Sequence, residues 1–241
     1  MRVSWILFVL LLSASAGCTS LNETESAQAN ACPEFGSGGY LFNIDKKSVK
    51  IGGRFELRPY FTERPGSFEP LSPACLSNIK VSDPGFGSVE KADNHKVLIQ
   101  VSDNAETGSL VYITASYLTQ SVIGRYTAYD PAATPLIGRW SQDKANCEPG
   151  SHIEELIFSA DGTFSVTWQP FESYKDYWGQ FEYGPETGGL TLNVEAGNAI
   201  PPDVTSGNIV ISDNLFEGIT ASFGTPEGKS LCSNSFQKQE G

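Results

Sequence analysis

The sequence predicts an all-β protein, and three features of the 241-residue chain support this prediction. Apolar and polar residues alternate with period two in segments such as 96–101 and 163–168, as in antiparallel strands with one buried face. Clusters of Gly, Pro, Asp and Asn, such as SDPGFG and YGPETGG, separate these segments at short intervals. No segment carries the apolar stripe of an amphipathic helix.

The N-terminal segment has the features of a signal peptide. Arg2 precedes the apolar run of residues 3–12, which as a helix would span about 15 Å, half of a hydrocarbon layer of about 30 Å. Two cleavage sites follow this run. A general signal peptidase would accept Ala14-Ser15-Ala16. A lipoprotein signal peptidase would read residues 15–18 as a lipobox, remove residues 1–17 and leave Cys18 as a lipidated first residue.

The cysteine count favours the lipoprotein interpretation over plain secretion. The chain has five cysteines, and an odd thiol is unfavourable in an oxidising compartment. If Cys18 carries lipid, four cysteines remain for two disulfides, namely Cys32, Cys75, Cys147 and Cys232. A third possibility is a secreted eukaryotic chain. In such a chain, Asn22-Glu23-Thr24 would be a glycosylation sequon.

The expected location is the cell envelope. In a cell with two membranes, Thr19 stands where Asp would signal retention in the inner membrane, which favours the outer membrane. We expect the protein to face the periplasm or the cell surface and to touch the membrane through its lipid alone; secretion is the alternative. Residues 19–31 are polar and predict a flexible tether of about 20 Å.

Two domains follow, with a boundary predicted near residues 129–135, where two prolines and small residues interrupt the strand pattern. Residues 32–130 carry 10 basic and 11 acidic side chains, whereas residues 131–241 carry 5 basic and 15 acidic ones. The acidic second domain disfavours nucleic acid or an anionic membrane surface as its partner. Strands are expected at 54–58, 96–101 and 111–117 in the first domain, and at 163–168 and 190–194 in the second.

Residues 44–128 resemble a known family in three segments: IDKKSVKIGGRFELRPYF, IKVSDPGFGSVEKADNHKVLIQVS and TGSLVYITASYL. This region resembles a bacterial immunoglobulin-like domain of the kind repeated in cell-surface proteins. The resemblance implies a sandwich of two antiparallel sheets that acts as a spacer or adhesion module and has no catalytic site. The stretch 62–74, rich in Pro and Ser, departs from the pattern.

A second resemblance covers residues 136–237 and rests on three segments: LIGRW, IEELIFSADGTFSVTW and YWGQFEYGPETGGLTLNV. This region is similar to small lipocalin-like domains, whose opening Gly-x-Trp corresponds to Gly138 and Trp140. The resemblance implies a small antiparallel β-barrel, and a basic side chain from its end stacked over the indole. Lys229 and Lys238 are the two candidates for that side chain. Asp161-Gly162 predicts a type I′ hairpin turn.

The disulfide pairing stays open at this point, because four cysteines allow three pairings. The preferred pairing joins Cys32 to Cys75 and Cys147 to Cys232, since this pairing needs no contact between the predicted domains.

The sequence gives no motif for catalysis. His95 and His152 are the two histidines of the chain and are expected at the surface. Glu154 and Glu155 are neighbours on a strand and therefore point to opposite faces, so they cannot flank one glycosidic bond. We expect no catalytic residues, no metal site, no cofactor and no enzymatic activity.

Aromatic residues predict the candidate binding site. Phe164, Val166 and Trp168 are expected to face inward together, whereas Trp178 has the opposite parity to Tyr177. A small apolar or aromatic-stacking ligand, neutral or cationic, is expected at the aromatic cluster, which comprises Trp140, Trp168, Tyr177, Trp178, Phe181 and Tyr183. The predicted function is therefore a non-enzymatic envelope lipoprotein that binds such a ligand or another envelope component. The alternative is a purely structural or adhesive module whose aromatic residues only fill the barrel.

Overall fold

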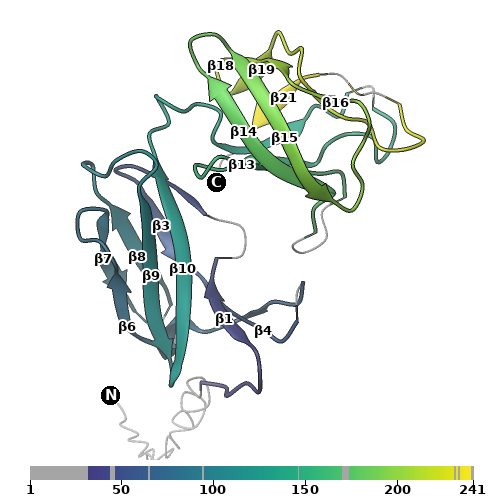
Figure 1. Cartoon of the computed structure of the whole chain (residues 1–241). Helices are drawn as coiled ribbons and strands as arrows, with labels where there is room; N and C mark the ends of the chain where they lie inside the picture. The colour runs from purple at the N-terminus through teal and green to yellow at the C-terminus, as the bar shows by residue number, and fades with distance from the viewer. Residues whose placement is uncertain are drawn as a thin grey trace, which may run out of the picture. The chain divides into compact units, whose positions relative to one another are not determined.

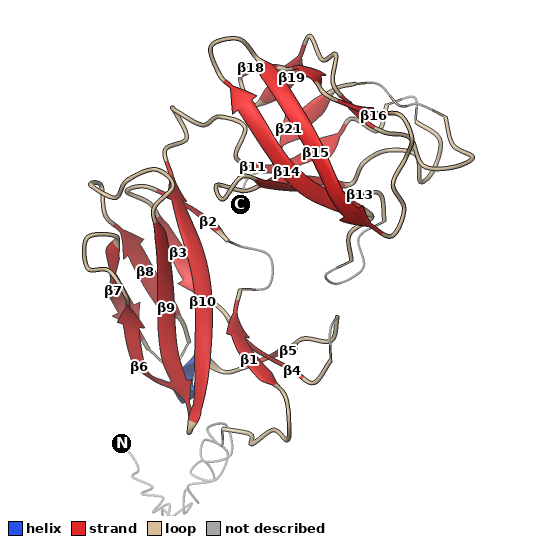
Figure 2. Ribbon diagram, viewed as in Figure 1, coloured by secondary structure: helices blue, strands red, loops and turns tan. Residues whose placement is uncertain are grey.

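The computed structural model describes residues 32–43, 47–64, 66–93, 95–145, 147–169, 174–230, 232 and 234–239. The predicted signal peptide, Cys18 and the tether lie outside these residues. The chain is nearly all β, as predicted, with half of its residues in strands. Apart from one 3-10 turn at Pro73–Cys75, the elements of the described ranges are strands (Figure 2). No helix in those ranges is both apolar and long enough to cross a membrane.

The strands before residue 130 form two sheets (Figure 1). The larger is a seven-stranded sheet in the order β5–β4–β1–β10–β9–β6, with β2 also paired to β10. Its strands are β1 (Gly39–Phe42), β2 (Ser48–Lys50), β4 (Pro59–Thr62), β5 (Glu69–Pro70), β6 (Leu76–Val81), β9 (Leu110–Tyr117) and β10 (Gln120–Tyr129). Strands β1 and β2 both run parallel to β10. The strands expected at 54–58, 96–101 and 111–117 are confirmed.

The smaller is a three-stranded sheet in the order β3–β8–β7, formed by β3 (Arg54–Leu57), β7 (Gly87–Ala92) and β8 (Val97–Val101). The alternate side chains Val97, Ile99 and Val101 of β8 are buried, as a one-sided sheet requires. The ring of Phe55 on β3 lies 4.8 Å from the ring of Tyr126 on β10. The buried faces of the two sheets therefore contact each other.

Asn43 fixes the point where the chain passes from one sheet to the other. Residues of β3 pair with β8, whereas β4, one residue later, pairs with β1. The Asn43 side chain donates to the carbonyl of Glu56 and accepts from the backbone N–H of Arg58. The buried Tyr126 hydroxyl donates to the same Asn43 oxygen at 2.7 Å. This network satisfies the polar groups at the bend, and burial raises the Tyr126 pKa.

The strands after residue 137 form a nearly closed, nine-stranded antiparallel barrel. Its order is β17–β15–β14–β13–β12–β11–β21–β19–β18. The strands are β11 (Gly138–Gln142), β12 (Glu155–Phe158), β13 (Thr163–Thr167), β14 (Tyr177–Gly184), β15 (Gly189–Gly197), β17 (Gly207–Asn208), β18 (Val210–Ser212), β19 (Leu215–Glu217) and β21 (Phe236–Lys238). The strands expected at 163–168 and 190–194 are confirmed. Among the described residues, no ladder joins the barrel strands to the strands before residue 130.

The barrel closes because the strands at the two ends of the sheet order are neighbours in the chain. Only the buried Ile209 separates β17, which pairs with β15, from β18, which pairs with β19. The Ile209 N–H donates to the carbonyl of Gly188 at 2.7 Å. Apart from β17 and β18, which are not paired with each other, each strand of this nine-stranded sheet pairs with the next one of the sheet along the chain, and β21 returns to pair with β11. This is an up-and-down meander.

An up-and-down meander places alternate connections at opposite ends of a barrel. At one end, which we call the hairpin end, lie the short turns 159–162, 185–188 and 213–214. The other end, the loop end, holds the long connections 143–154, 168–176, 198–206 and 218–235. Two of them contribute the short strands β16 (Val204–Thr205) and β20 (Ser222–Phe223), which pair with each other.

Two hairpin turns differ from expectation. The Asp161-Gly162 turn is not type I′, because only Gly162 has a positive φ and its N–H bonds to the Ser159 carbonyl. The β18–β19 turn instead has positive φ at both central residues, Asp213 and Asn214, as a type I′ turn requires. Asp and Asn tolerate this conformation better than other non-glycine residues.

The preferred disulfide pairing is confirmed. Cys32 is bonded to Cys75, and Cys147 to Cys232. In the second pair the Cα atoms are 5.0 Å apart and the residues are 85 apart in sequence.

Candidate functional site

Aromatic side chains fill the interior of the barrel. Neighbouring rings contact one another in a continuous series, with centroid distances between 4.2 and 6.4 Å. The series runs through Trp140, Phe216, Phe223, Phe158, Phe164, Tyr177 and Trp168, and every member is buried. Side chains therefore occupy the place where a roomy barrel would hold its ligand.

The six aromatic residues of the predicted site do not line one pocket. Trp140, Trp168 and Tyr177 belong to the filled core. Phe181 and Tyr183 are half-buried against that core on the inner side of β14. Trp178 is 38% exposed, which places it on the outer side. The inward set of Phe164, Val166 and Trp168 and the opposite parity of Trp178 and Tyr177 are confirmed.

At the hairpin end, Lys238 caps the indole of Trp140. The Lys238 Nζ lies 5.2 Å from the centroid of the ring and donates to the carbonyl of Pro135 at 2.6 Å. The Trp140 Nε1–H donates to the carbonyl of Leu136 at 2.8 Å. Gly138 makes room for this cap, because a Cβ there would meet the Lys238 Cε at 2.7 Å. Burial lowers the Lys238 pKa to about 8. Of the two candidate lysines, Lys238 is therefore the one over the tryptophan.

At the loop end, bonds between the connections hold them together. The disulfide between Cys147 and Cys232 joins 143–154 to 218–235. The Lys229 Nζ, which the sequence left as a candidate for stacking on Trp140, donates instead to the Pro149 carbonyl at 3.0 Å, across the same two connections.

Further bonds extend this arrangement to the other two connections. The carboxylate of Asp203 accepts from the backbone N–H and the hydroxyl of Thr225, each at 3.0 Å. The Asn198 side chain donates to the Lys175 carbonyl at 2.8 Å, and the Asn198 backbone N–H donates to the Asp176 carbonyl at 2.7 Å. All four connections are thus cross-linked, which lowers the ordering cost of binding at this end.

Trp168 is the first residue of the connection 168–176. Its backbone N–H is satisfied by the Asp176 carboxylate at 2.8 Å, and the other oxygen of that carboxylate accepts from the Tyr174 hydroxyl at 3.3 Å. Its indole Nε1, however, is buried and finds no acceptor on the described protein atoms. A buried donor without a partner costs about 1–3 kcal/mol. The loop end therefore holds one buried donor that no described protein atom satisfies.

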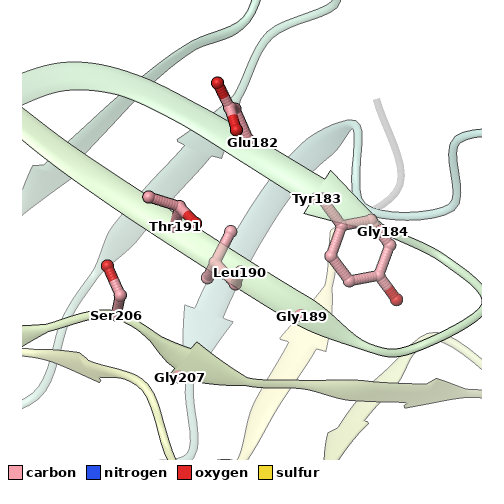
Figure 3. A pocket seen from close by; sticks show the side chains of 8 residues that line it. All are labelled: Glu182, Tyr183, Gly184, Gly189, Leu190, Thr191, Ser206 and Gly207. Atoms are coloured by element: carbon pink, nitrogen blue, oxygen red, sulfur yellow. The ribbon is translucent and has the colours of Figure 1, made fainter.

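A surface depression of about 630 Å³ lies where β14 and β15 pass the start of β17 (Figure 3). Glu182 and Tyr183 come from β14, Leu190 and Thr191 from β15, and Ser206 from the segment before β17. Leu190 is itself buried in the core, so Tyr183 is the main apolar side chain that lines the depression. Ligand sites are usually lined mainly by apolar side chains. This depression is therefore a weak candidate for an apolar ligand.

A charged cluster occupies the start of β12. Glu154 accepts from the Lys144 Nζ at 3.0 Å and contacts the His152 Nε2 at 2.7 Å. Burial opposes ionisation of Glu154, but these two partners outweigh it and lower the pKa of the carboxyl. The expected position of His152 at the surface is wrong, since its side chain is only 13% exposed. Glu155 pairs separately with Arg139 at 3.0 Å. His95 is exposed, as expected.

In the described ranges, no three His, Cys, Asp or Glu side chains are grouped closely enough to hold a metal ion. No protein-family model matches the chain, and no curated protein is significantly similar to it in sequence.

The sequence did not reveal the acceptor role of Asp176 or the cross-links made by Asn198 and Asp203. The available signal was indirect, because Asn and Asp in strand-connecting segments commonly bond to nearby backbone groups.

Proposed function

We propose that the protein is an envelope lipoprotein, anchored through Cys18, that binds a neutral or cationic ligand at the loop end of its barrel without catalysing a reaction. The observation that carries this proposal is the buried Trp168 indole donor, without a protein acceptor, among four cross-linked connections. The ligand, either free or part of another envelope component, would present a hydrogen-bond acceptor on an apolar body. The excess of acidic residues in 131–241 disfavours an anion.

The strand order supports an immunoglobulin-like sandwich as the first domain, residues 32–130. The sheets β3–β8–β7 and β10–β9–β6 match the two sheets of a seven-stranded immunoglobulin fold, with β2 alongside β10 as a first strand. The hairpin of β4 with β5 falls in the stretch 62–74 that departs from the family pattern. Such a domain would act as a spacer between the lipid and the barrel.

The barrel supports a lipocalin-like second domain, residues 131–241. Strands β11 to β15 pair in chain order, and a lysine near the C-terminus caps the tryptophan of the opening Gly-x-Trp. These features accord with the resemblance of LIGRW to the start of lipocalin-like domains.

The disulfides support the anchor and the envelope location. Cys32, Cys75, Cys147 and Cys232 are bonded in two pairs, so Cys18 is the one cysteine that remains for a lipid. Two disulfides accord with an oxidising compartment outside the cytoplasm. Metabolic labelling with a fatty-acid analogue should mark the wild type but not Cys18→Ala. An unlabelled wild type that begins at Gly17 would refute the anchor.

A structural or adhesive module is the second candidate, and the filled aromatic interior favours it. In that case the loop end would only stabilise the barrel. The two candidates differ in whether a small molecule binds near Trp168.

Titration with Nile red, a neutral apolar dye that carries a carbonyl, separates them. We expect saturable binding to the Cys18→Ala chain and about fivefold weaker binding to Trp168→Phe, which keeps a ring but loses the donor. Trp178→Phe is the matched control, because Trp178 lies on the outer side of the barrel. Absence of binding, or equal affinity in all three chains, would favour the structural module.

A further inference from the structure

The outward face of the seven-stranded sheet carries a row of paired residues that is apolar from Pro70 to Ile123 and ends in Thr114 and Lys80. Side chains that are directly paired across strands lie on the same face. The strand registers place one residue from each of β5, β4, β1, β10, β9 and β6 side by side across the sheet. In order, they are Pro70, Tyr60, Leu41, Ile123, Thr114 and Lys80. At the centre of this row, Ile123 is 49% exposed.

The neighbouring row adds an aromatic residue and a cation. Tyr112, 47% exposed, is paired with Arg125, which is also exposed. We call this surface the sheet face and define it by Leu41, Tyr60, Lys80, Tyr112, Ile123 and Arg125. Its two charged residues are both cations, although the whole chain has a net charge of −12. Protein interfaces are enriched in Tyr and Arg, which also dominate their binding energy.

A second exposed surface has the complementary character. On the outer side of the β18–β19 hairpin, Val210 is 52% exposed and is paired with Glu217, while Leu215 is 38% exposed. Asp213 lies in the turn between these strands. We call Val210, Asp213, Leu215 and Glu217 the hairpin face. Its charged residues are both acidic, and its apolar residues lie beside them.

We propose that the sheet face of one copy of the chain binds the hairpin face of a second copy. Each face has an apolar part and charges of a single sign, so each would repel a copy of itself and attract the other. The contact is therefore heterologous, and it leaves a free face on each partner for a further copy.

This contact is small and is expected to be weak. Interfaces that bury less than about 1,200 Å² in total are typically transient. Copies held on one membrane would reach a high effective concentration, at which a weak contact still forms. The inference goes beyond the proposed function and does not depend on the lipid or on a ligand.

Sedimentation velocity on the full mature chain with Cys18→Ala tests this proposal. We expect the average mass to rise with protein concentration between about 10 µM and about 1 mM, and to fall when salt is added. Arg125→Glu and Glu217→Arg should each weaken self-association by about tenfold, because each places like charges opposite each other. Lys96→Glu, a charge reversal in the exposed connection between β7 and β8, is the matched control and should have no effect.

The double variant Arg125→Glu/Glu217→Arg makes the test specific. It restores opposite charges across the contact, so self-association should return to near the level of the wild type. A chain that stays monomeric at every concentration would overturn the proposal. The proposal would also be overturned if the single variants associated as the wild type does. The same holds if the double variant associated as weakly as the single variants.

Discussion

Trp140 and Trp168 are both buried in the aromatic core of the barrel, but they lie toward opposite ends and differ in their polar contacts. The Trp140 indole donates to Leu136 and is covered by Lys238. The Trp168 indole finds no acceptor on the described protein atoms. The polar groups of the tryptophan at the hairpin end are therefore satisfied, whereas the loop end keeps a buried donor without a protein acceptor. Tertiary packing alone explains the first end, and a binding role gives a reason for the second.

Removal of the Cys147–Cys232 disulfide should have the largest effect on stability. The double variant Cys147→Ala/Cys232→Ala should lower the free energy of unfolding by about 2–4 kcal/mol, because the disulfide closes a long loop across the loop end. Tryptophan emission during denaturation measures this, since Trp140, Trp168 and Trp178 all belong to the barrel region. An unchanged unfolding midpoint would mean that the other cross-links hold the loop end on their own.

Replacement of each buried tryptophan by phenylalanine compares the two ends directly. Trp140→Phe should cost about 2 kcal/mol or more, because it leaves the Leu136 carbonyl without its donor and replaces the indole under Lys238 by a smaller ring. Trp168→Phe should cost less than about 1 kcal/mol, because the lost donor had no protein partner. Chemical denaturation of both variants gives the difference. Equal losses would remove the distinction between the ends.

Titration of Lys238 gives a pH-dependent prediction for the hairpin end. Its pKa is about 8 in the folded chain and 10.5 ordinarily. Between these values the unfolded chain holds a proton that the folded chain has released, so stability should rise with pH. The free energy of unfolding of the wild type should therefore increase relative to Lys238→Met from pH 8 to pH 10.5. Below pH 8 the difference should be constant. A difference that stays flat throughout would show that Lys238 is not buried by its cap.

Period-two alternation predicted the strands whose inner positions carry large apolar side chains, such as β8 and β13. It missed β10, because the inward positions of that strand include Gly124 and Ala128. A Cβ at Gly124 would meet the Tyr126 ring at 2.7 Å, so packing selects a residue that hides the pattern. Closure of the barrel at Ile209 also depends on pairing partners that are distant in sequence.

The candidate site was predictable only in part. The aromatic content of residues 131–241 indicated the barrel region, and the resemblance to lipocalin-like domains limited the cap to two lysines. Which of the tryptophans lacks an acceptor depends on the backbone around Leu136 and Asp176. No sequence pattern encodes that difference, because both side chains occupy buried positions of the same type.

A ¹H–¹⁵N spectrum recorded with and without Nile red tests the loop end most directly. In one measurement, the indole N–H signals report on the two ends of the barrel (Trp140 and Trp168) and on its outer side (Trp178). If the loop end binds, the Trp168 Nε1–H signal should move downfield as it gains an acceptor, while the signals of Trp140 and Trp178 stay in place. If Nile red binds and the Trp168 signal does not move, or if the Trp178 signal moves instead, the loop end is not the binding site.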